Sequence, residues 1–310
     1  MKIIFPDPID LTEEHIKTIE KLGGVVIFYD NIPGSESDVL GRISDADVII
    51  PNWIPITAHI IQNAPSLRFI IVPAVGYESV DVKAASSAGI MVVNCPTHNS
   101  RAVAEYTIAL LFSLTRRIIE ANTDFKYGEW NPIRYTGIEL KDKKLGLIGY
   151  GTIGKIVGQL ALNIGMKVSY ANSKTPADEL DKLLASSDII SLHLPLTDKT
   201  RHLIDERRLQ LMRRDAYLIN TARGAIIDQK ALIKVLKSGH LSGAALDVFE
   251  NEPHGGKPSQ ELLVLAHYRN VIATPHIAFN TSEAVYRLGE ELIANIKSIR
   301  DGNPMNVILP

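Results

Sequence analysis

Short apolar segments rich in valine and isoleucine alternate with amphipathic helical patterns along the whole chain. Strand candidates lie at 2–5, 24–29, 47–50, 67–73, 91–94, 144–149, 167–171, 189–194, 216–221, 244–249 and 271–274. Helical patterns lie between them, for example at 152–164, 178–186 and 228–238. Continuous apolar strands are typical of sheets covered on both faces, and a regular β-α alternation requires parallel strands joined by right-handed crossovers. The sequence therefore predicts an α/β protein with doubly wound parallel sheets.

A long helical stretch separates two runs of these β-α units. The first run covers residues 1–95, and residues 100–127, rich in alanine, leucine and isoleucine, then predict one long helix. A final helix is predicted over 281–300, with Asn280 as its N-cap and Glu283 three residues on. At about 150 residues per domain, the 310 residues are enough for two domains.

The composition excludes several classes of protein. The 33 Lys and Arg residues against 35 Asp and Glu leave a net charge of −2, which excludes bulk attraction to nucleic-acid phosphates. The single cysteine, Cys95, cannot form an internal disulfide and indicates a reducing compartment. The longest apolar stretches, 43–61 and 102–119, contain charged residues, and the N-terminal apolar run is too short for a signal peptide. We therefore expect a cytoplasmic protein without nucleic-acid or membrane partners.

A glycine-rich motif directly follows a strand candidate and directly precedes a helical pattern. Gly149, Gly151 and Gly154 form G-x-G-x-x-G, with Thr152 and Ile153 between the last two glycines. The first glycine permits a tight turn, the second lets the backbone approach a pyrophosphate, and the third allows close helix–strand packing. The helix N-terminus supplies free N–H groups. A glycine-rich turn without a ligand is the alternative, but the flanking strand and helix favour dinucleotide binding.

The next strand lacks the acidic residue that usually binds the adenosine ribose of NAD. The chain there reads Asn172, Ser173 and Lys174, and no acid follows until Asp178. An acid would repel a 2′-phosphate, whereas Asn, Ser and Lys can donate hydrogen bonds to it and Lys adds a positive charge. We therefore predict NADP as the favoured cofactor. The alternative is a simple loop that binds NAD through its diphosphate.

Three later strand candidates end in reactive side chains. Arg223 follows the first, Glu250 and Glu252 follow the second, and His276 follows the third. Ligands of open parallel sheets bind beyond the carboxyl ends of the strands, so we expect these side chains in one crevice. Each of them alone is also explained by a surface ion pair or a structural role. Together they supply what hydride transfer to a 2-keto acid needs: an arginine for the carboxylate, and a histidine kept protonated by an acid.

The sequence resembles the D-isomer-specific 2-hydroxyacid dehydrogenase family over nearly its whole length. This family includes glyoxylate/hydroxypyruvate reductases, D-lactate dehydrogenases and phosphoglycerate dehydrogenases. The motifs that carry the resemblance, besides the glycine loop, are Val75-Gly76-Tyr77, Asn94-Cys95-Pro96, Asn99-Ser100-Arg101-Ala102-Val103-Ala104-Glu105, His193-Leu194-Pro195-Leu196-Thr197, Asn220-Thr221-Ala222-Arg223-Gly224, Asp247-Val248-Phe249-Glu250-Asn251-Glu252-Pro253 and Thr274-Pro275-His276. Their number and their order exclude a chance resemblance.

The resemblance implies the catalytic roles. Arg223 would bind the substrate carboxylate and polarise the keto oxygen, and His276 would donate a proton to that oxygen during reduction and remove it during oxidation. Glu252, rather than Glu250, matches the family position that pairs with the histidine. The expected reaction is NAD(P)-dependent reduction of a small 2-keto acid to the D-2-hydroxy acid, and its reverse.

The resemblance also implies binding contacts. The backbone N–H groups of Val75 and Gly76 would hold the substrate carboxylate. The cofactor contacts expected outside the glycine loop and residues 172–174 are His193, Pro195, Thr200, Thr221, Ala222 and Asp247. Of these, Asp247 would lie by the nicotinamide amide.

A discontinuous domain layout is a further implication of the resemblance. Residues 1–98 and 278–310 would form a flavodoxin-like substrate domain, into which a Rossmann cofactor domain of residues 99–277 is inserted. Family members are typically homodimers, in which helices near the start of the cofactor domain pack across the axis.

The sequence departs from phosphoglycerate-type members at two places. Those members have a basic residue after the third strand, where this chain reads Ile50-Pro51-Asn52-Trp53, and they have a C-terminal extension, whereas this sequence stops at Pro310. Both departures argue against 3-phosphoglycerate as the substrate. Trp53 is a candidate for capping a small substrate pocket, or else an ordinary packed aromatic residue, and Phe279 has the same two interpretations.

Two other functions remain as alternatives. One is a nicotinamide-sensing binding protein or corepressor on the same scaffold, without turnover. The other is a different nucleotide-dependent enzyme, such as a methyltransferase. A metal site is not expected, because Cys95 and His98 have no second pair that would complete a zinc site.

Overall fold

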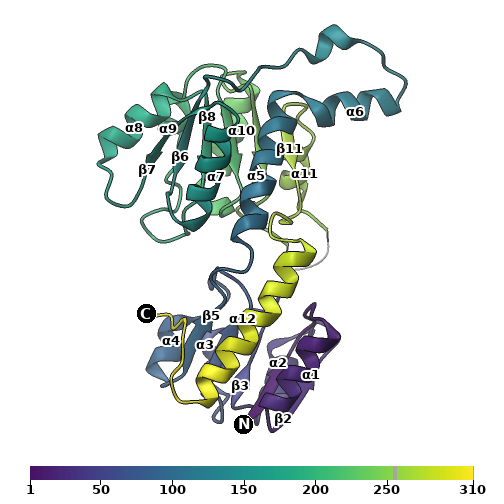
Figure 1. Ribbon diagram of the computed structural model, residues 1–310, viewed down its shortest axis with the longest axis vertical. Coiled ribbons are helices and arrows are strands. Elements are labelled where there is room, and N and C mark those ends of the chain that lie inside the picture. Colours follow the sequence, from purple (N-terminus) through teal and green to yellow (C-terminus); the bar gives the residue numbers. More distant parts are fainter. Residues whose placement is uncertain (254–256, 310) are drawn as a thin grey trace. The chain divides into compact units, whose positions relative to one another are not determined.

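The computed structural model describes residues 1–253 and 257–309, which divide into two compact units. Met1–Asn99 and Asn280–Pro310 form the split unit, and Ser100–Phe279 form the inserted unit (Figure 1). The structure thus changes units after residues 99 and 279, where the sequence predicted changes after residues 98 and 277. No helix within the described ranges is long and apolar enough to cross a membrane.

The split unit contains a five-stranded parallel sheet in the order β2-β1-β3-β4-β5, the flavodoxin-like order. The strands are β1 Lys2–Phe5, β2 Val25–Phe28, β3 Val48–Ile49, β4 Phe69–Val72 and β5 Met91–Asn94. The helices are α1 Glu13–Leu22, α2 Glu36–Ile43, α3 Ala58–Gln62, α4 Val82–Ser87 and α12 Ser282–Arg300. Because side chains alternate along a strand, Ile3 and Phe5 pack on α1 and α12, whereas Ile4 packs on α2 and α3.

The inserted unit contains a six-stranded parallel sheet in the order β11-β10-β9-β8-β6-β7. The strands are β6 Lys144–Ile148, β7 Lys167–Ala171, β8 Ile189–Leu192, β9 Tyr217–Asn220, β10 Gly243–Leu246 and β11 Val271–Ala273. In the usual Rossmann order a third strand lies outside the second, but here the chain passes from β7 directly to β8, which pairs with β6. β7 is therefore an edge strand.

Helices cover both faces of this second sheet. The helical segments are α5 Ser100–Thr115, α6 Ile118–Lys126, η1 Pro132–Tyr135, α7 Thr152–Asn163, α8 Ala177–Ser186, α9 Glu206–Leu211, η2 Gly224–Ile226, α10 Gln229–Lys237 and α11 Gln260–Ala266. Leu147 of β6 packs on α5 and α7, whereas its neighbour Ile148 packs on the helices of the other face. The predicted class, two doubly wound parallel sheets, is confirmed.

Two details of the predicted helices were wrong, the continuity of one helix and the N-cap residue of another. The helix predicted over 100–127 breaks at Arg117, whose φ of 53° is left-handed, so that α5 and α6 are separate helices. α5 packs in the core, whereas no residue of α6 is buried. The N-cap of α12 is Thr281 rather than Asn280, because the Thr281 side chain accepts the N–H of Ala284.

Candidate active site

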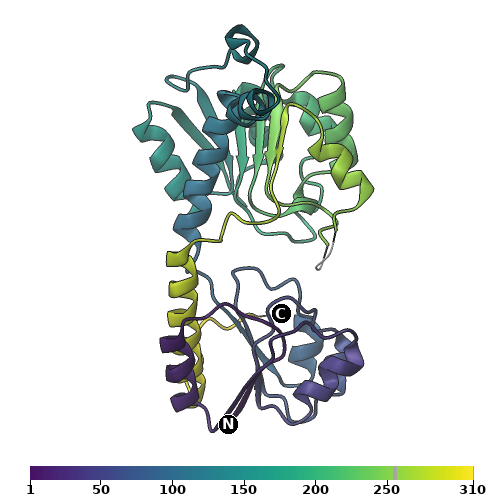
Figure 2. The same ribbon diagram turned by 90° about the vertical axis from the view of Figure 1, so that its right-hand side faces the viewer.

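All strands of the inserted unit run in the same direction, so their carboxyl ends form one edge of the sheet (Figure 2). The three predicted catalytic residues follow three neighbouring strands at this edge. Arg223 follows β9, Glu252 follows β10 and His276 follows β11. The glycine motif and the segment beginning at His193 follow β6 and β8 at the same edge.

Glu252 and His276 form a direct pair. Nδ1 of His276 lies 2.7 Å from Oε2 of Glu252, and the other carboxylate oxygen accepts the N–H of Phe249 at 2.8 Å. Burial raises the pKa of the Glu252 carboxyl, but the hydrogen bonds from His276 and Phe249 and the Arg223 charge outweigh burial and hold this pKa below its usual range. Glu252 is therefore a carboxylate at neutral pH, and a carboxylate favours the charged form of an adjacent imidazole.

His276 lies in a strained turn that Asp247 holds in place. The φ of His276 is 52°, in the left-handed region that non-glycine residues rarely adopt. The buried carboxylate of Asp247 accepts the N–H groups of Ile277 at 3.0 Å and Ala278 at 2.8 Å, and the hydroxyl of Thr274 at 2.6 Å. Its backbone carbonyl accepts the N–H of His276 at 2.8 Å. Sequence reasoning missed this anchoring of the histidine turn.

Arg223 is half-buried on a turn organised by Asn220. The Asn220 amide donates to the Arg223 carbonyl at 2.9 Å and accepts the Ala222 N–H at 3.0 Å. Nη1 of Arg223 donates to the Ala222 carbonyl at 2.7 Å, which orients the guanidinium. Thr221, at the end of the strand, exchanges a hydrogen bond of 2.9 Å with Thr107 of α5. These contacts fix the arginine relative to the sheet.

The glycine motif has the shape that a dinucleotide requires. Gly149 has a φ of 96°, and a Cβ there would lie 2.1 Å from the carbonyl oxygen of His193. A Cβ at Gly154 would lie 2.3 Å from the carbonyl oxygen of Gly149. Gly151 is the N-cap of α7 and a Cβ there would meet only open space, so the N-terminal N–H groups of α7, including those of Thr152 and Ile153, are approachable by a diphosphate.

The segment after β8 lies next to this loop. Nε2 of His193 lies 2.8 Å from the Ser191 hydroxyl, and burial lowers the pKa of His193 to about 3, so its ring is neutral. The Thr200 hydroxyl accepts the N–H of Thr197 and donates to the carbonyl of Pro195, both at 2.7 Å. These bonds define the local turn.

The segment after β7 is an exposed turn. The Asn172 side chain accepts the N–H of Lys174 at 2.9 Å, and the Asn172 N–H donates to the Thr175 hydroxyl at 2.9 Å. Ser173 and Lys174 are exposed, and in the part of the chain that the structure describes the Lys174 ammonium has no ion-pair partner.

Sequence reasoning missed a flat stack of Tyr150 on Tyr170, with ring centroids 3.9 Å apart.

The predicted substrate-binding residues of the split unit follow β3 and β4. Val75 and Gly76 are half-buried, and the Val75 carbonyl accepts the Asn94 amide at 2.7 Å. Trp53 is 54% exposed. The buried Asp7 carboxyl accepts the N–H groups of residues 52, 53 and 54, and burial raises its pKa although these hydrogen bonds oppose the shift.

Phe279 is the last residue of the inserted unit. Its ring lies edge-on to His276, with centroids 6.1 Å apart. Among the residues that the structure describes, no group of three or more His, Cys, Asp or Glu side chains could hold a metal ion.

The fold and the arrangement of Arg223, Glu252 and His276 at one edge of the sheet define a dehydrogenase of 2-hydroxy acids. Residues 108–278 match the family model for the NAD-binding domain of D-isomer specific 2-hydroxyacid dehydrogenases. The chain belongs to the D-isomer specific 2-hydroxyacid dehydrogenase family. The predicted family and enzyme class are thereby confirmed.

Individual relatives are similar over nearly the whole chain. A glyoxylate reductase of Korarchaeum cryptofilum is 36% identical over 96% of this chain and 93% of its own length. A hydroxypyruvate reductase of Blautia hydrogenotrophica is 34% identical over 99% of both chains. A solved structure described as an acyclic imino acid reductase (Bsp5) in complex with NADPH and D-Arg is 35% identical, with a TM-score of 0.90 over the full length of both chains.

Proposed function

We propose that the protein reduces a small 2-keto acid to the D-2-hydroxy acid and catalyses the reverse oxidation, with His276 as the acid and base and Arg223 holding the carboxylate. The observation that carries this proposal is the 2.7 Å pair of His276 and Glu252 at the strand edge where Arg223 also lies. Names of the similar proteins, glyoxylate reductase and hydroxypyruvate reductase, support small keto acids as the substrate class.

His276, Glu252 and Arg223 have different roles in the proposed reaction. When bound, the reduced nicotinamide supplies a hydride to the keto carbon. His276 then delivers a proton to the keto oxygen, and Glu252 stabilises the imidazolium before that transfer. Arg223 binds the carboxylate and stabilises the negative charge that develops on the oxygen. In oxidation the same histidine removes the hydroxyl proton.

The glycine loop fits a dinucleotide, and the turn after β7 favours NADP. Gly149, Gly151 and the N-terminus of α7 would hold the diphosphate. Ser173 and Lys174 are exposed beyond the edge strand and would bind a 2′-phosphate, and residues 172–177 contain no acid that would repel it. The similar solved structure in complex with NADPH supports this preference. NAD bound through the diphosphate is the alternative.

The loop after β3 disfavours a phosphorylated substrate. It has no basic side chain at residues 50–53. The N–H groups of residues 52–54, which could bind an anion, already donate to the Asp7 carboxyl. A keto acid with a small uncharged side chain therefore fits this loop better than 3-phosphoglycerate.

The segment of α6 and η1, residues 118–135, supports a homodimer. Its apolar side chains are exposed: Tyr127 by 86%, Trp130 by 81% and Ile133 by 84%. An exposed apolar patch of this kind marks a protein contact. In Figure 1 the segment extends away from the sheet of its own unit. A second copy of the chain is the partner that we propose for it.

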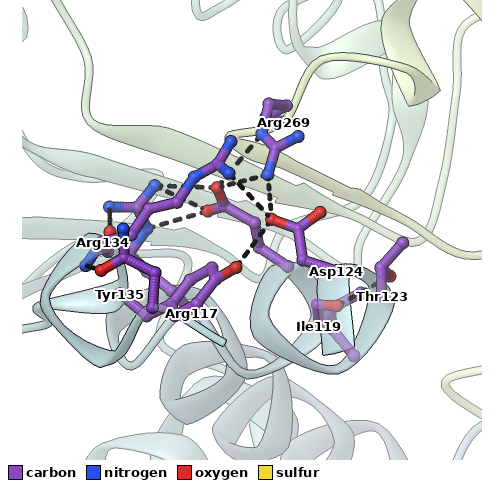
Figure 3. A network of polar contacts seen from close by, with 9 residues as sticks. Arg117, Ile119, Thr123, Asp124, Arg134, Tyr135 and Arg269 are labelled. Atoms are coloured by element: carbon purple, nitrogen blue, oxygen red, sulfur yellow. Dashed lines mark hydrogen bonds and ion pairs between the residues drawn. The ribbon is translucent and has the colours of Figure 1, made fainter. Parts of the chain in front are cut away.

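A charged network holds this segment in shape before any partner binds (Figure 3). Arg117 donates two hydrogen bonds to Glu120, at 2.8 and 2.9 Å, and Tyr135 donates to Asp124 at 2.8 Å. Arg269, just before β11, donates to both carboxylates. The Tyr135 hydrogen bond and the arginine charges hold the pKa of Asp124 below its usual range. The Asp124 carboxylate therefore stays ionised at neutral pH.

Reduction of an acyclic imino acid is a second candidate, favoured by the similarity to Bsp5. An imino acid has the same carboxylate and an equivalent trigonal carbon, so a hydride would reach the carbon and a proton the nitrogen. The same residues would serve both reactions.

One panel of assays tests these proposals. Glyoxylate, hydroxypyruvate, pyruvate and branched or aromatic keto acids are each tried with NADH and NADPH, with and without an amine. We expect NADPH oxidation with a small keto acid alone, and a loss of at least a hundredfold in His276→Gln. Oxidation that requires the amine would favour imine reduction. Binding of NADPH without any turnover would favour the sensing protein and contradict the proposed enzyme.

A further inference from the structure

A second histidine–glutamate pair lies on the segment that carries Glu252. Nε2 of His202 donates to Oε1 of Glu250 at 2.7 Å, and Glu250 is two residues before Glu252. The side chains of His202 and Glu250 are 40% and 24% exposed, so the pair is partly shielded from water.

The backbone around Glu250 joins three strand-end loops. A Cβ at Gly224, next to Arg223, would lie 2.0 Å from the carbonyl oxygen of Phe249, so these two loops are in direct backbone contact. The Glu250 N–H donates weakly to Gln229 at the start of α10, at 3.4 Å. His202 is itself fixed in a left-handed conformation, with a φ of 49°, and its N–H donates to the Ala225 carbonyl at 2.8 Å.

Glu252 depends on this segment for its position. One of its oxygens accepts the N–H of Phe249, the residue before Glu250, and the other accepts Nδ1 of His276. A displacement of residues 249–250 would therefore move the carboxylate relative to the imidazole. The ionisable groups placed against the segment by the described contacts are His202 on Glu250, and Arg223 and His276 on Glu252.

We propose that His202 and Glu250 are positioning residues, which fix the segment 249–252 so that Glu252 meets His276 in the geometry for proton transfer. In the described contacts neither side chain bonds to Glu252 or His276, so both act on this pair through the backbone. Their contribution is the support that a catalytic pair needs from side chains around it. The proposal rests on the proposed function, because it gives His276 the role of acid and base.

The test follows the imidazole of His276 by NMR as a function of pH, in the full-length protein without substrate. The His276 signal is assigned from its loss in His276→Gln. We expect the titration midpoint to fall by about half a pH unit in Glu250→Ala and in His202→Ala, since the carboxylate of Glu252 is held less closely. Glu250→Gln keeps an acceptor for His202 and is expected to retain the wild-type midpoint. Glu252→Gln removes the carboxylate itself and is therefore expected to lower the His276 midpoint more than the other variants.

A chemically matched pair in the split unit provides the control. His59 and Glu36 lie 3.0 Å apart on the surface, and His59→Ala is expected to leave the His276 midpoint unchanged. We also expect kcat for keto-acid reduction to fall about fivefold in Glu250→Ala, with KM changed less than twofold. Wild-type midpoints in both alanine variants, or an equal shift in His59→Ala, would overturn the proposal. The NMR titration of His276 needs no turnover, so its result does not depend on whether the protein has the proposed activity.

Discussion

Nδ1 of His276 and Oε2 of Glu252 lie 2.7 Å apart although the two residues are 24 positions apart in the sequence. The two residues follow the neighbouring strands β11 and β10, and parallel pairing of those strands brings their ends together. Glu252 is anchored through Phe249, and His276 through the turn that Asp247 holds. Hydrogen bonds to backbone N–H groups thus position both residues of the pair.

Replacing Glu252 by Gln is expected to lower kcat for reduction by about 10- to 100-fold. The pKa of Glu252 is held below its usual range, so this carboxylate is ionised throughout the neutral range and stabilises the imidazolium there. Without it, His276 loses its proton at a lower pH, and the alkaline limb of the pH profile of kcat/KM moves to lower pH. Glu252→Asp keeps the charge and is expected to retain part of the activity. An unshifted alkaline limb in Glu252→Gln would contradict the assignment.

Replacing Lys174 by Glu is expected to raise KM for NADPH about tenfold or more, because a favourable charge on the 2′-phosphate becomes a repulsive one. KM for NADH is expected to change little. Initial rates with both cofactors measure the effect, and Lys237→Glu, an exposed change on α10, is the control for net charge. An equal rise for both cofactors would show that Lys174 does not distinguish them.

Much of the fold could be predicted from the sequence because buried parallel strands are continuous apolar runs. Each predicted strand segment overlaps an observed strand. The glycine motif was recognisable because Gly149 and Gly154 occupy positions where a Cβ would clash with backbone. The break at Arg117 was not predictable, since helix-compatible residues lie on both sides of it and no proline or glycine within 100–127 marks it.

The strand-end position of each candidate site residue was predictable, but its contacts were not. Asp247 is a buried anchor for the His276 turn, which depends on N–H groups at 277 and 278 that no pattern reveals. The pairing of His202 with Glu250 joins residues 48 positions apart. Such contacts arise from tertiary packing of loops and leave no periodic signal.

In the split unit, replacing Glu291 by Gln is expected to destabilise the fold by about 1–3 kcal/mol at neutral pH. Its carboxylate accepts the N–H groups of Thr97 and His98, at 3.1 and 3.2 Å. Burial raises its pKa, but the hydrogen bonds from His98 and Thr97 outweigh burial and lower it. A lowered pKa stabilises the folded state above the usual carboxyl pKa of about 4.3, and the contribution is lost as pH falls through the lowered value. Tm measured across this range in wild type and variant tests the sign, with exposed Glu13→Gln as the control.

Replacing Trp130 and Ile133 by Glu is expected to convert a dimer into a monomer, because both side chains are exposed by more than 80% and would be buried by a second copy. Size-exclusion chromatography with light scattering measures the mass. Leu309→Glu, at a position 82% exposed in the split unit, is the matched control and is expected to leave the dimer intact. The charged network around Asp124 is untouched, so the segment is expected to keep its shape. A monomeric wild type, or an unchanged mass in the double variant, would contradict the proposed interface.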